Sequence, residues 1–545
     1  MNSKKAVLGS IATIGVAMFA LTACSSDGGD TSPSTSETAG SGSSSAIIMT
    51  NGSEPENPLI PGNTNETGGG KILDSIFAGL VYYDATGAVH NEVAESIVVS
   101  DDAMTVDVTL QDGWTFTNGE PVTASSFVDA WNYTAQASNA YLNSYYFEDI
   151  DGFSYDEDSA LNIDVTDDLN FTIHLNKPAA DFAQRLGYTA FMPLPTAFYD
   201  DPEAYGENPI GDGPYMLAGD GAWQHNVQID LVTNPDYKGG RTPQNGGVTF
   251  VFYASQDAAY ADLLQNNVDV IDGIPDSSLA TYQTELGDRA VNQAAAIFQS
   301  FTIPESLPHF SGEEGKLRRQ ALSMAIDRPT ITNVIFNDTR TPASDFTSPV
   351  VDGFSDTLTG ADVLSYNPDK AVELWAEADA ISPWDGTFGI AYNSDGGHQA
   401  WVDAVANSIK NVLGIDAEGA PYATFKELRS AVNDRTITTA FRTGWQADYP
   451  GLYNFLGPLY KTDAGSNDGD YSNPEFDALL EQGISTADND ARNALLQQAQ
   501  EILLQDLPAI PLWYSNVDGG FSENVSNVTF GWNSVPLYYE ITKSA

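Results

Sequence analysis

The chain has 545 residues, 42% of them hydrophobic and 11% aromatic, so it is long and apolar enough to build more than one folded domain. Its formal net charge of −53, from 75 acidic against 22 basic residues, argues against binding to nucleic acids or anionic membranes, because phosphates require clustered Lys and Arg. A single cysteine excludes an intramolecular disulfide and a CxxC metal or redox motif.

Residues 1–23 have the organisation of a secretory signal. A basic MNSKK precedes an apolar run over residues 6–20, which is shorter than the roughly 20 residues that a membrane-spanning helix needs. The sequence LTAC that ends at Cys24 resembles a bacterial lipobox, in which cleavage precedes the cysteine and the cysteine is lipidated. The alternative is an ordinary cleavage site that happens to precede a cysteine. Residues 24–45 are rich in Ser and Gly and predict a flexible tether.

Order is expected to begin near Ala46. Apolar and polar residues alternate over 104–110, which predicts a half-buried strand. Asp-Gly and Asn-Gly pairs flank Trp114 and Phe116 and favour a hairpin there. Thr123 is a candidate cap for a following helix, because apolar residues then recur at helical spacing.

The C-terminal part continues the alternation of strand and helix patterns. Asn473-Pro474 is expected to start a helix, and a second helix follows over about 491–503 and stops before Pro508. The next segment, AIPLWY at 509–514, is typical of a buried strand. The chain is therefore expected to be a mixed α/β protein with more than one lobe.

Local signatures of catalysis are absent from the sequence. The five histidines are far apart, which excludes HExxH and similar zinc spacings, and no GxSxG or GxxxxGK[ST] motif occurs. The stretch NTNETGGGKILD, residues 63–74, partly matches calcium-loop spacing, but it begins with Asn and ends with Asp in place of Glu. These absences favour a binding protein over an enzyme, with no metal or cofactor implied.

Several segments, in order, resemble the extracytoplasmic solute-binding proteins of peptide ABC transporters, the oligopeptide- and dipeptide-binding family (solute-binding protein family 5). The segments are EPENPLIP at 54–61, IFAGLVYYDATGAV at 76–89, NPIGDGPYML at 208–217, LRRQALSMAIDR at 317–328 and GWQADYPG at 444–451. Each is weakly informative alone, whereas the ordered set is specific and extends over nearly all of the chain from about residue 50 to 515.

The resemblance implies an α/β, bilobal, periplasmic-binding-protein-like fold with an inserted extra subdomain in lobe one. Two crossing strands would form a hinge, so that the lobes close around a ligand. The implied parts are lobe one at 46–90, 207–300 and 506–545, the inserted subdomain at 91–206, and lobe two at 301–505.

The resemblance also implies four ligand-binding residues. Asp448 would anchor the α-ammonium of a peptide, because a carboxylate in a closed cleft binds an ammonium strongly. Arg442 would pair with a peptide carboxylate, Trp445 would line a side-chain pocket, and Tyr449 would bind the peptide backbone. If the resemblance is set aside, the local sequence predicts that Asp448 caps a turn, that Trp445 is a core residue, and that Arg442 pairs with a neighbouring acid. Pro450-Gly451 departs from the family pattern, so the course of this loop is open.

The expected function is a monomeric receptor, held outside the cell by lipid on Cys24, that captures short peptides and delivers them to an ABC permease. Relatives on this fold carry oligosaccharides, nickel or haem, and these ligands remain alternatives. A secreted hydrolase with a dispersed active site is a further alternative, as is a receptor that senses peptides without importing them.

Overall fold

The computed structural model describes residues 45–55, 57–394, 397–423 and 425–544. The predicted signal peptide, Cys24 and all of the tether except Ser45 lie outside these residues, so those expectations stay predictions. Within the described ranges, no helix combines the length and the apolar character that crossing a membrane requires.

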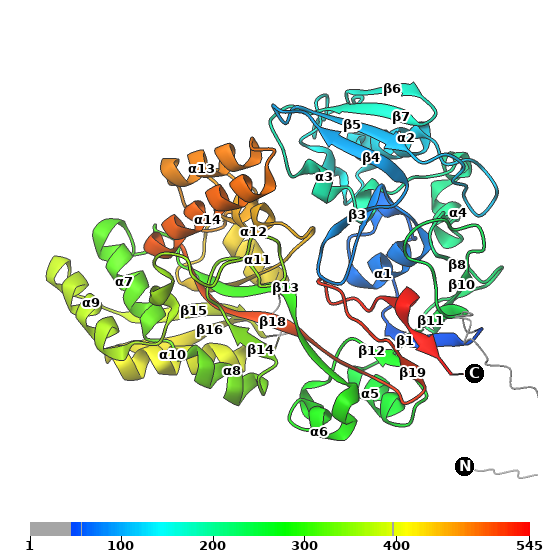
Figure 1. Cartoon of the computed structure of the whole chain (residues 1–545). Helices are drawn as coiled ribbons and strands as arrows, with labels where there is room; N and C mark the ends of the chain where they lie inside the picture. Colours follow the sequence, from blue (N-terminus) through cyan, green and yellow to red (C-terminus); the bar gives the residue numbers. More distant parts are fainter. Residues whose placement is uncertain (1–44, 56, 395–396, 424, 545) are drawn as a thin grey trace, which may run out of the picture. The chain divides into compact units, whose positions relative to one another are not determined.

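A mixed sheet of twelve strands runs through the described part of the chain (Figure 1). Its main path is β16 (Asp416–Tyr422), β15 (Thr387–Asn393), β17 (Ala440–Gln446), β13 (Ala290–Thr302), β18 (Ala509–Phe521), β12 (Val270–Ile271), β1 (Ile47–Gly52), β11 (Gly247–Phe252), β10 (Gln228–Thr233) and β8 (Tyr215–Leu217). Strands β14 (Arg340–Pro342) and β9 (Trp223–Gln224) pair at its side with β18 and β10. Parallel pairing joins β1 to β11 and β15 to β16, whereas β13 and β18 are antiparallel.

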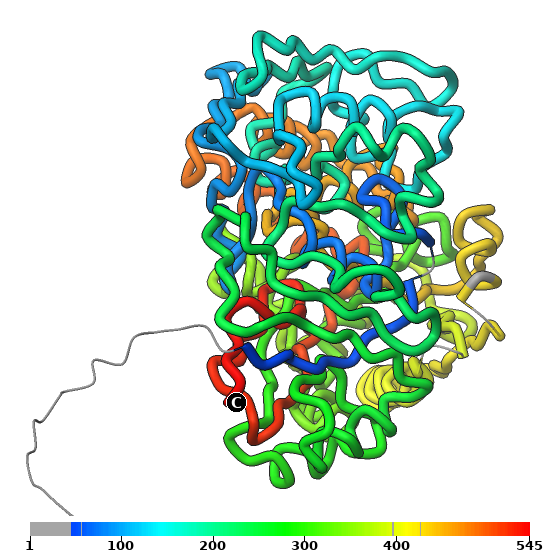
Figure 2. The backbone as a smooth tube through the Cα atoms, turned by 90° about the vertical axis from the view of Figure 1, so that its right-hand side faces the viewer, coloured from blue at the N-terminus to red at the C-terminus, as the bar shows by residue number. Residues whose placement is uncertain are grey.

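Smaller sheets complete the strand content. The largest is antiparallel, in the order β4 (Ala94–Val99), β5 (Thr105–Leu110), β7 (Asn170–His174) and β6 (Ile163–Asp167). It belongs to a stretch that lies together at the top of the view in Figure 2, coloured light blue to cyan. Two pairs, β2 (Val81–Tyr83) with β3 (Val89–Asn91) and β19 (Val525–Ser526) with β20 (Thr542–Lys543), stand apart.

Helices connect and cover these strands. They are α1 (Thr67–Ile76), α2 (Ala124–Ala135), α3 (Phe182–Arg185), α4 (Pro202–Glu207), α5 (Gln256–Leu264), α6 (Tyr282–Leu286), α7 (Gly312–Met324), α8 (Arg328–Phe336), α9 (Pro368–Ile381), α10 (Gln399–Leu413), α11 (Phe425–Asn433), α12 (Leu452–Tyr460), α13 (Pro474–Ile484) and α14 (Asn489–Asp506). Figure 1 shows α7 to α10 gathered around the β15–β16 end of the large sheet.

Most of the elements expected from local patterns are confirmed. Strand β5 buries Val106, Val108 and Leu110, and α2 starts directly after Thr123. Helix α13 begins at Pro474, because the Asn473 side chain accepts hydrogen bonds from the N–H groups of Glu475 and Phe476. The expected hairpin around Trp114 and Phe116 is present in a short form. The Thr115–Pro121 bridge is flanked by hydrogen bonds from the Phe116 N–H to the Glu120 carbonyl, at 2.8 Å, and from the Val122 N–H to the Trp114 carbonyl, at 2.9 Å.

Two large hydrophobic cores lie on either side of the long strands β13 and β18. The first core takes its residues from 48–270 and 517–541, and the second takes nearly all of its residues from 296–514. Both strands run between them, since β18 contributes Tyr514 to the second core and Val517 to the first. This division agrees with two lobes joined by crossing strands, while the boundaries given for the individual parts remain predictions.

Candidate ligand-binding site

A cavity of about 300 Å³ lies among segments that are distant in sequence. One wall is the loop before α1 and the first turns of that helix, a second is Tyr188 with its neighbours, and a third is the loop from Gln446 to Asp448. Trp532, Asn533 and Val535 close the remaining side. Residues of both hydrophobic cores therefore flank the cavity, which makes it the best candidate for a ligand site between them.

The α1 wall is built from the stretch that partly matched a calcium loop. Both Glu66 carboxylate oxygens accept from the Gly69 N–H, at 2.9 and 3.0 Å, and this cap starts the helix. Ile72, Leu73 and Ile76 anchor the helix in the first core, whereas Gly70 and Lys71 line the cavity. Within the part of the chain that the structure describes, no cluster of His, Cys, Asp and Glu is arranged to hold a metal ion.

The cavity's lysine is already neutralised by the protein. Lys71 is 8% exposed and forms an ion pair with Asp272, which follows β12. The Asn51 amide donates to the same carboxylate at 2.8 Å. Lys71 is therefore a fixed, paired charge, and the carboxyl groups of the cavity wall belong to Glu66, Asp74 and Asp448.

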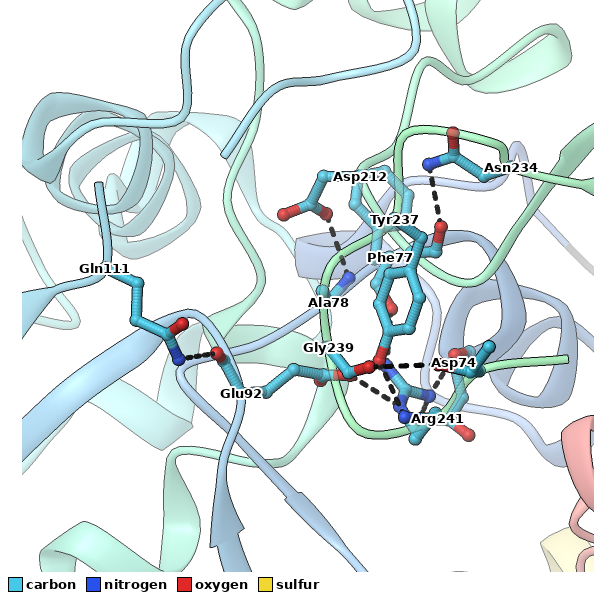
Figure 3. A network of polar contacts seen from close by, with 12 residues as sticks. Asp74, Phe77, Ala78, Glu92, Gln111, Asp212, Asn234, Tyr237, Gly239 and Arg241 are labelled. Carbon is cyan, nitrogen blue, oxygen red and sulfur yellow. Dashed lines mark hydrogen bonds and ion pairs between the residues drawn. The ribbon is translucent and has the colours of Figure 1, made fainter. Parts of the chain in front are cut away.

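A buried arginine fixes the C-terminal end of α1 (Figure 3). Arg241 donates to the backbone oxygens of Asp74 and Phe77, at 2.6 and 2.8 Å, and forms an ion pair with the fully buried Glu92. The Ala78 N–H, just beyond the helix, donates to Asp212 at 2.9 Å. Burial raises the pKa of Asp212 well above its ordinary value, which favours the neutral form of this carboxyl. The network holds the α1 wall in place.

Asp448 lines the opposite wall and is half-buried. Its carboxylate accepts a hydrogen bond from the Asn454 amide at 3.2 Å, and among the described residues it has no ion-pair partner. Burial raises the pKa of Asp448 above its ordinary value, while Asn454 and Tyr146 act in the opposite direction. An acid that lines a cavity without an ion-pair partner is suited to bind a cationic group of a ligand.

Tyrosines surround this carboxylate. The rings of Tyr146 and Tyr188 are stacked with their centroids 4.3 Å apart, and Tyr188 lines the cavity. The Tyr146 hydroxyl is buried and has no hydrogen-bond partner within the described residues, although it lies close enough to influence the Asp448 carboxyl. Burial, with a smaller contribution from the charge of Asp448, raises the pKa of Tyr188 to about 12. Both hydroxyls are therefore neutral, and that of Tyr188, which lines the cavity, is able to hydrogen bond to a polar ligand.

Trp445 and Arg442 line a second cavity, of about 200 Å³, next to α11. The Trp445 indole N–H donates to Asn454 at 2.9 Å, so one amide contacts both Trp445 and Asp448. Arg442 donates through Nε to Asn393 at 2.9 Å, and its guanidinium carbon lies 4.9 Å from the centroid of the Phe425 ring. The two residues come from β17, the strand that leads into the Asp448 loop.

Tyr449 lies outside both cavities. Its side chain is 5% exposed, and its hydroxyl donates to Asp181 at 2.9 Å. Of the four residues that the sequence singled out, the structure thus brings Asp448 to the larger cavity and Arg442 and Trp445 to the smaller one. The ligand-binding roles assigned to these residues remain predictions.

A family model described as bacterial extracellular solute-binding proteins, family 5, middle region, matches residues 88–467, which is more than half of the chain. The chain belongs to this family. The solute-binding protein is 24% identical over 489 residues to the oligopeptide-binding protein OppA of Bacillus subtilis, covering 86% of this chain and 88% of OppA. It is 26% identical over 373 residues to heme-binding protein A of Haemophilus influenzae, covering 65% and 64% of the two chains.

The fold also matches a solved structure of MppA, a periplasmic murein tripeptide-binding protein, in its unliganded open form, with a TM-score of 0.80 and 22% identity over 92% of this chain and 97% of that one. The solute-binding protein therefore has the bilobal α/β fold that its motifs predicted. Members of family 5 are extracytoplasmic binding proteins of transport systems, so it is a binding protein and not an enzyme.

Sequence reasoning missed much of the larger cavity. Asn454, Tyr188, Lys71 and Trp532 were not singled out, although all four lie at the site. A signal existed for the α1 wall, because a Gly-rich turn at a helix start followed by a lysine often marks a place where a ligand approaches the backbone. No local pattern distinguishes the other three residues from ordinary core and cap residues.

Proposed function

We propose that this protein is a lipid-anchored extracytoplasmic receptor that captures short peptides through their α-ammonium and delivers them to an ABC permease. The observation that carries the proposal is Asp448, a half-buried carboxylate at the larger cavity that forms no ion pair with any of the described residues. The other acids of the wall, Glu66 and Asp74, are engaged by a helix N-terminus and by Arg241. The names of relatives such as OppA support a peptide as the ligand.

The β17 strand offers a place for the peptide backbone. It pairs with β13 over Phe441–Gln446, whereas β15 covers its other edge only at Ala440 and Phe441. Over Thr443–Gln446 no strand pairs with that second edge within the described residues, so an extended peptide can hydrogen bond to it. Asp448 would bind the N-terminal end and Arg442 a carboxylate further along, with Trp445 beside a side chain.

The decisive experiment is calorimetric binding of a mixture of two- to six-residue peptides, with free and with acetylated N-termini. Wild type should bind the free peptides and bind the acetylated ones at least tenfold more weakly. Asp448→Asn should weaken the binding of free peptides by about 3 kcal/mol, roughly a hundredfold in Kd, and should abolish the preference for a free N-terminus. Equal affinity for both peptide forms in the wild type would remove the ammonium anchor.

Haem is the alternative that one relative favours, because heme-binding protein A is similar to this chain over most of its length. The described residues that line the larger cavity include no His, Cys or Met, and their aromatic residues are Tyr83, Tyr188 and Trp532. Titration with haemin, followed by its Soret band, tests this alternative directly. A haemin Kd below that of every peptide would replace the peptide proposal.

The lipid anchor and the delivery step need cellular experiments. Cys24 should incorporate radioactive palmitate in the wild type and not in Cys24→Ser. A strain that lacks the receptor should lose uptake of the radiolabelled peptide that binds best, and expression of the wild type should restore it. Binding without any change in uptake would indicate a sensing role instead.

A further inference from the structure

Tyr449, the residue next to Asp448, forms a hydrogen bond with a segment that is distant in sequence. Its hydroxyl donates to Asp181 Oδ2 at 2.9 Å, and both side chains are buried, with relative exposures of 5% and 2%. Asp181 directly precedes the short helix α3. The two residues are 268 positions apart in sequence.

Arg185 completes the contact. It donates to Asp181 Oδ1 at 2.9 Å and to Asp149 Oδ2 at 2.5 Å, so it holds two buried carboxylates at once. Its guanidinium carbon lies 5.5 Å from the centroid of the Tyr449 ring. Burying several charges is costly unless each is paired, so this group of residues strongly prefers an arrangement that keeps Arg185 between the two carboxylates.

The two sides of this contact belong to different cores. Phe182 and Leu186, around Arg185, pack in the first core, whereas Ala447 and Leu452, on either side of Tyr449, pack in the second. The α1 wall of the larger cavity also belongs to the first core. The contact therefore joins the loop that carries Asp448 to the body that carries the opposite wall of the same cavity.

Further contacts close by join the same two bodies. The Ala180 N–H donates to the Ile484 carbonyl, at the end of α13, at 2.7 Å. Gly87, in the turn between β2 and β3, lies so close to Pro450 that an added Cβ would come within 2.8 Å of the proline Cβ. The Asp448 loop therefore contacts the turn between β2 and β3 as well as Asp181.

We propose that Tyr449, Asp181 and Arg185 are positioning residues, which set the place of the Asp448 carboxylate relative to the α1 wall without contacting the ligand. The inference rests on the proposed function, in which a peptide ammonium binds Asp448. A ligand that contacts both walls gains most when their separation is fixed before it binds, because it then spends less binding energy on ordering the protein. The same contact slows the separation of the two walls, so its loss should act mainly on ligand dissociation.

Tyr449→Phe is the sharpest test, because it removes only the hydroxyl. We expect the Kd of a peptide with a free N-terminus to rise about tenfold, mainly through faster dissociation, as measured by stopped-flow fluorescence. Arg185→Lys, which keeps the charge but cannot span both carboxylates, should act in the same direction. Tyr460→Phe is the matched control, since Tyr460 is equally buried in α12 and its hydroxyl has no hydrogen-bond partner among the described residues.

A measurement without ligand separates this inference from the proposed function. In the ligand-free protein, Tyr449→Phe should speed hydrogen exchange of the Ala180 amide and of residues 447–451, while the amides of the β13–β18 ladder keep their wild-type rates. Unchanged exchange at Ala180 together with unchanged peptide dissociation would overturn the inference and leave the proposed function intact. If the wild type binds no peptide, the proposed function fails, and the exchange rates alone then decide whether the contact fixes the loop.

Discussion

Asn454 contacts Asp448 twice, accepting the Asp448 backbone N–H at 3.1 Å and donating to its carboxylate at 3.2 Å. Its carbonyl oxygen also accepts the Trp445 indole N–H at 2.9 Å. Asn454 is 2% exposed and lies in the first turn of α12, which packs against the second core. One buried amide therefore sets both the backbone and the side chain of the proposed ammonium anchor.

Replacing this amide should weaken binding as well as stability. Asn454→Ala leaves two part-buried N–H groups without this acceptor, which should lower the free energy of unfolding by about 1–3 kcal/mol and raise the Kd for peptides at least tenfold. Asn467→Ala is the matched control, because Asn467 is also buried and makes three hydrogen bonds but lies outside the larger cavity. Chemical denaturation and calorimetry on both variants check this. Equal peptide affinity in the two variants would contradict it.

Peptide affinity should fall in acid. Burial raises the pKa of Asp448 above its ordinary value of 3.8, and only the ionised carboxylate attracts an ammonium. Affinity should therefore be complete well above that raised pKa and decrease as the pH falls through it, with proton uptake by the free protein. Kd measured from pH 3.5 to 7.5 for free and N-acetylated peptides tests this. The acetylated peptide should show the smaller change, and a flat profile for the free peptide would argue against Asp448.

Gly70 allows the cavity to be narrowed without disturbing the core. It lines the cavity, and a Cβ added there would meet no atom within 4 Å. Gly70→Ala should raise the free energy of unfolding by about 0.5–1 kcal/mol, because alanine favours the helix, with little effect on binding. Gly70→Leu should stay folded and lose peptide affinity, because the larger side chain occupies ligand space. Calorimetry on the two variants checks this, and unchanged affinity in Gly70→Leu would place the peptide elsewhere.

Arg442 should matter only for peptides with a free carboxyl end. Arg442→Lys is expected to raise the Kd of such peptides roughly tenfold, because lysine cannot form the two parallel hydrogen bonds of a guanidinium. Peptides with an amidated C-terminus should bind wild type and variant alike. Arg429→Lys serves as the control, because it makes the same substitution in the same small cavity at an arginine with no proposed contact to the peptide carboxylate. An equal loss for amidated peptides would give Arg442 a structural role.

Asp345 should make stability depend on pH. It is fully buried, and burial raises its pKa to about 6, although it accepts hydrogen bonds from Tyr514 and Thr347. Because the folded pKa exceeds the ordinary 3.8, its contribution to stability is complete below about pH 4 and is lost as the pH rises through about 6. The free energy of unfolding of Asp345→Asn, measured relative to that of the wild type, should therefore increase by up to about 3 kcal/mol between pH 4 and pH 7.

Urea unfolding of the wild type and Asp345→Asn at several pH values measures this difference. Asp356→Asn is the control, because it makes the same substitution at an exposed position. A pH-independent difference between Asp345→Asn and the wild type would mean that Asp345 keeps the same protonation state throughout.

The sequence by itself determined the local elements and the family. Asn473-Pro474 predicted the start of α13 because a cap acts over three residues, and the alternation in β5 predicted its buried face because a strand repeats every two. The family-like motifs, taken in order along the chain, predicted the bilobal fold. The motif GWQADYPG singled out Asp448, which does line the larger cavity.

Tertiary structure alone decided what surrounds that residue. The pairs Lys71–Asp272 and Tyr449–Asp181 join residues 201 and 268 positions apart, and no local spacing encodes such meetings. The Tyr449 hydroxyl donates to Asp181, and the stretch that partly matched a calcium loop forms a cavity wall. The physical reason is that long-range packing places each side chain against the partner that satisfies its charge and hydrogen bonds.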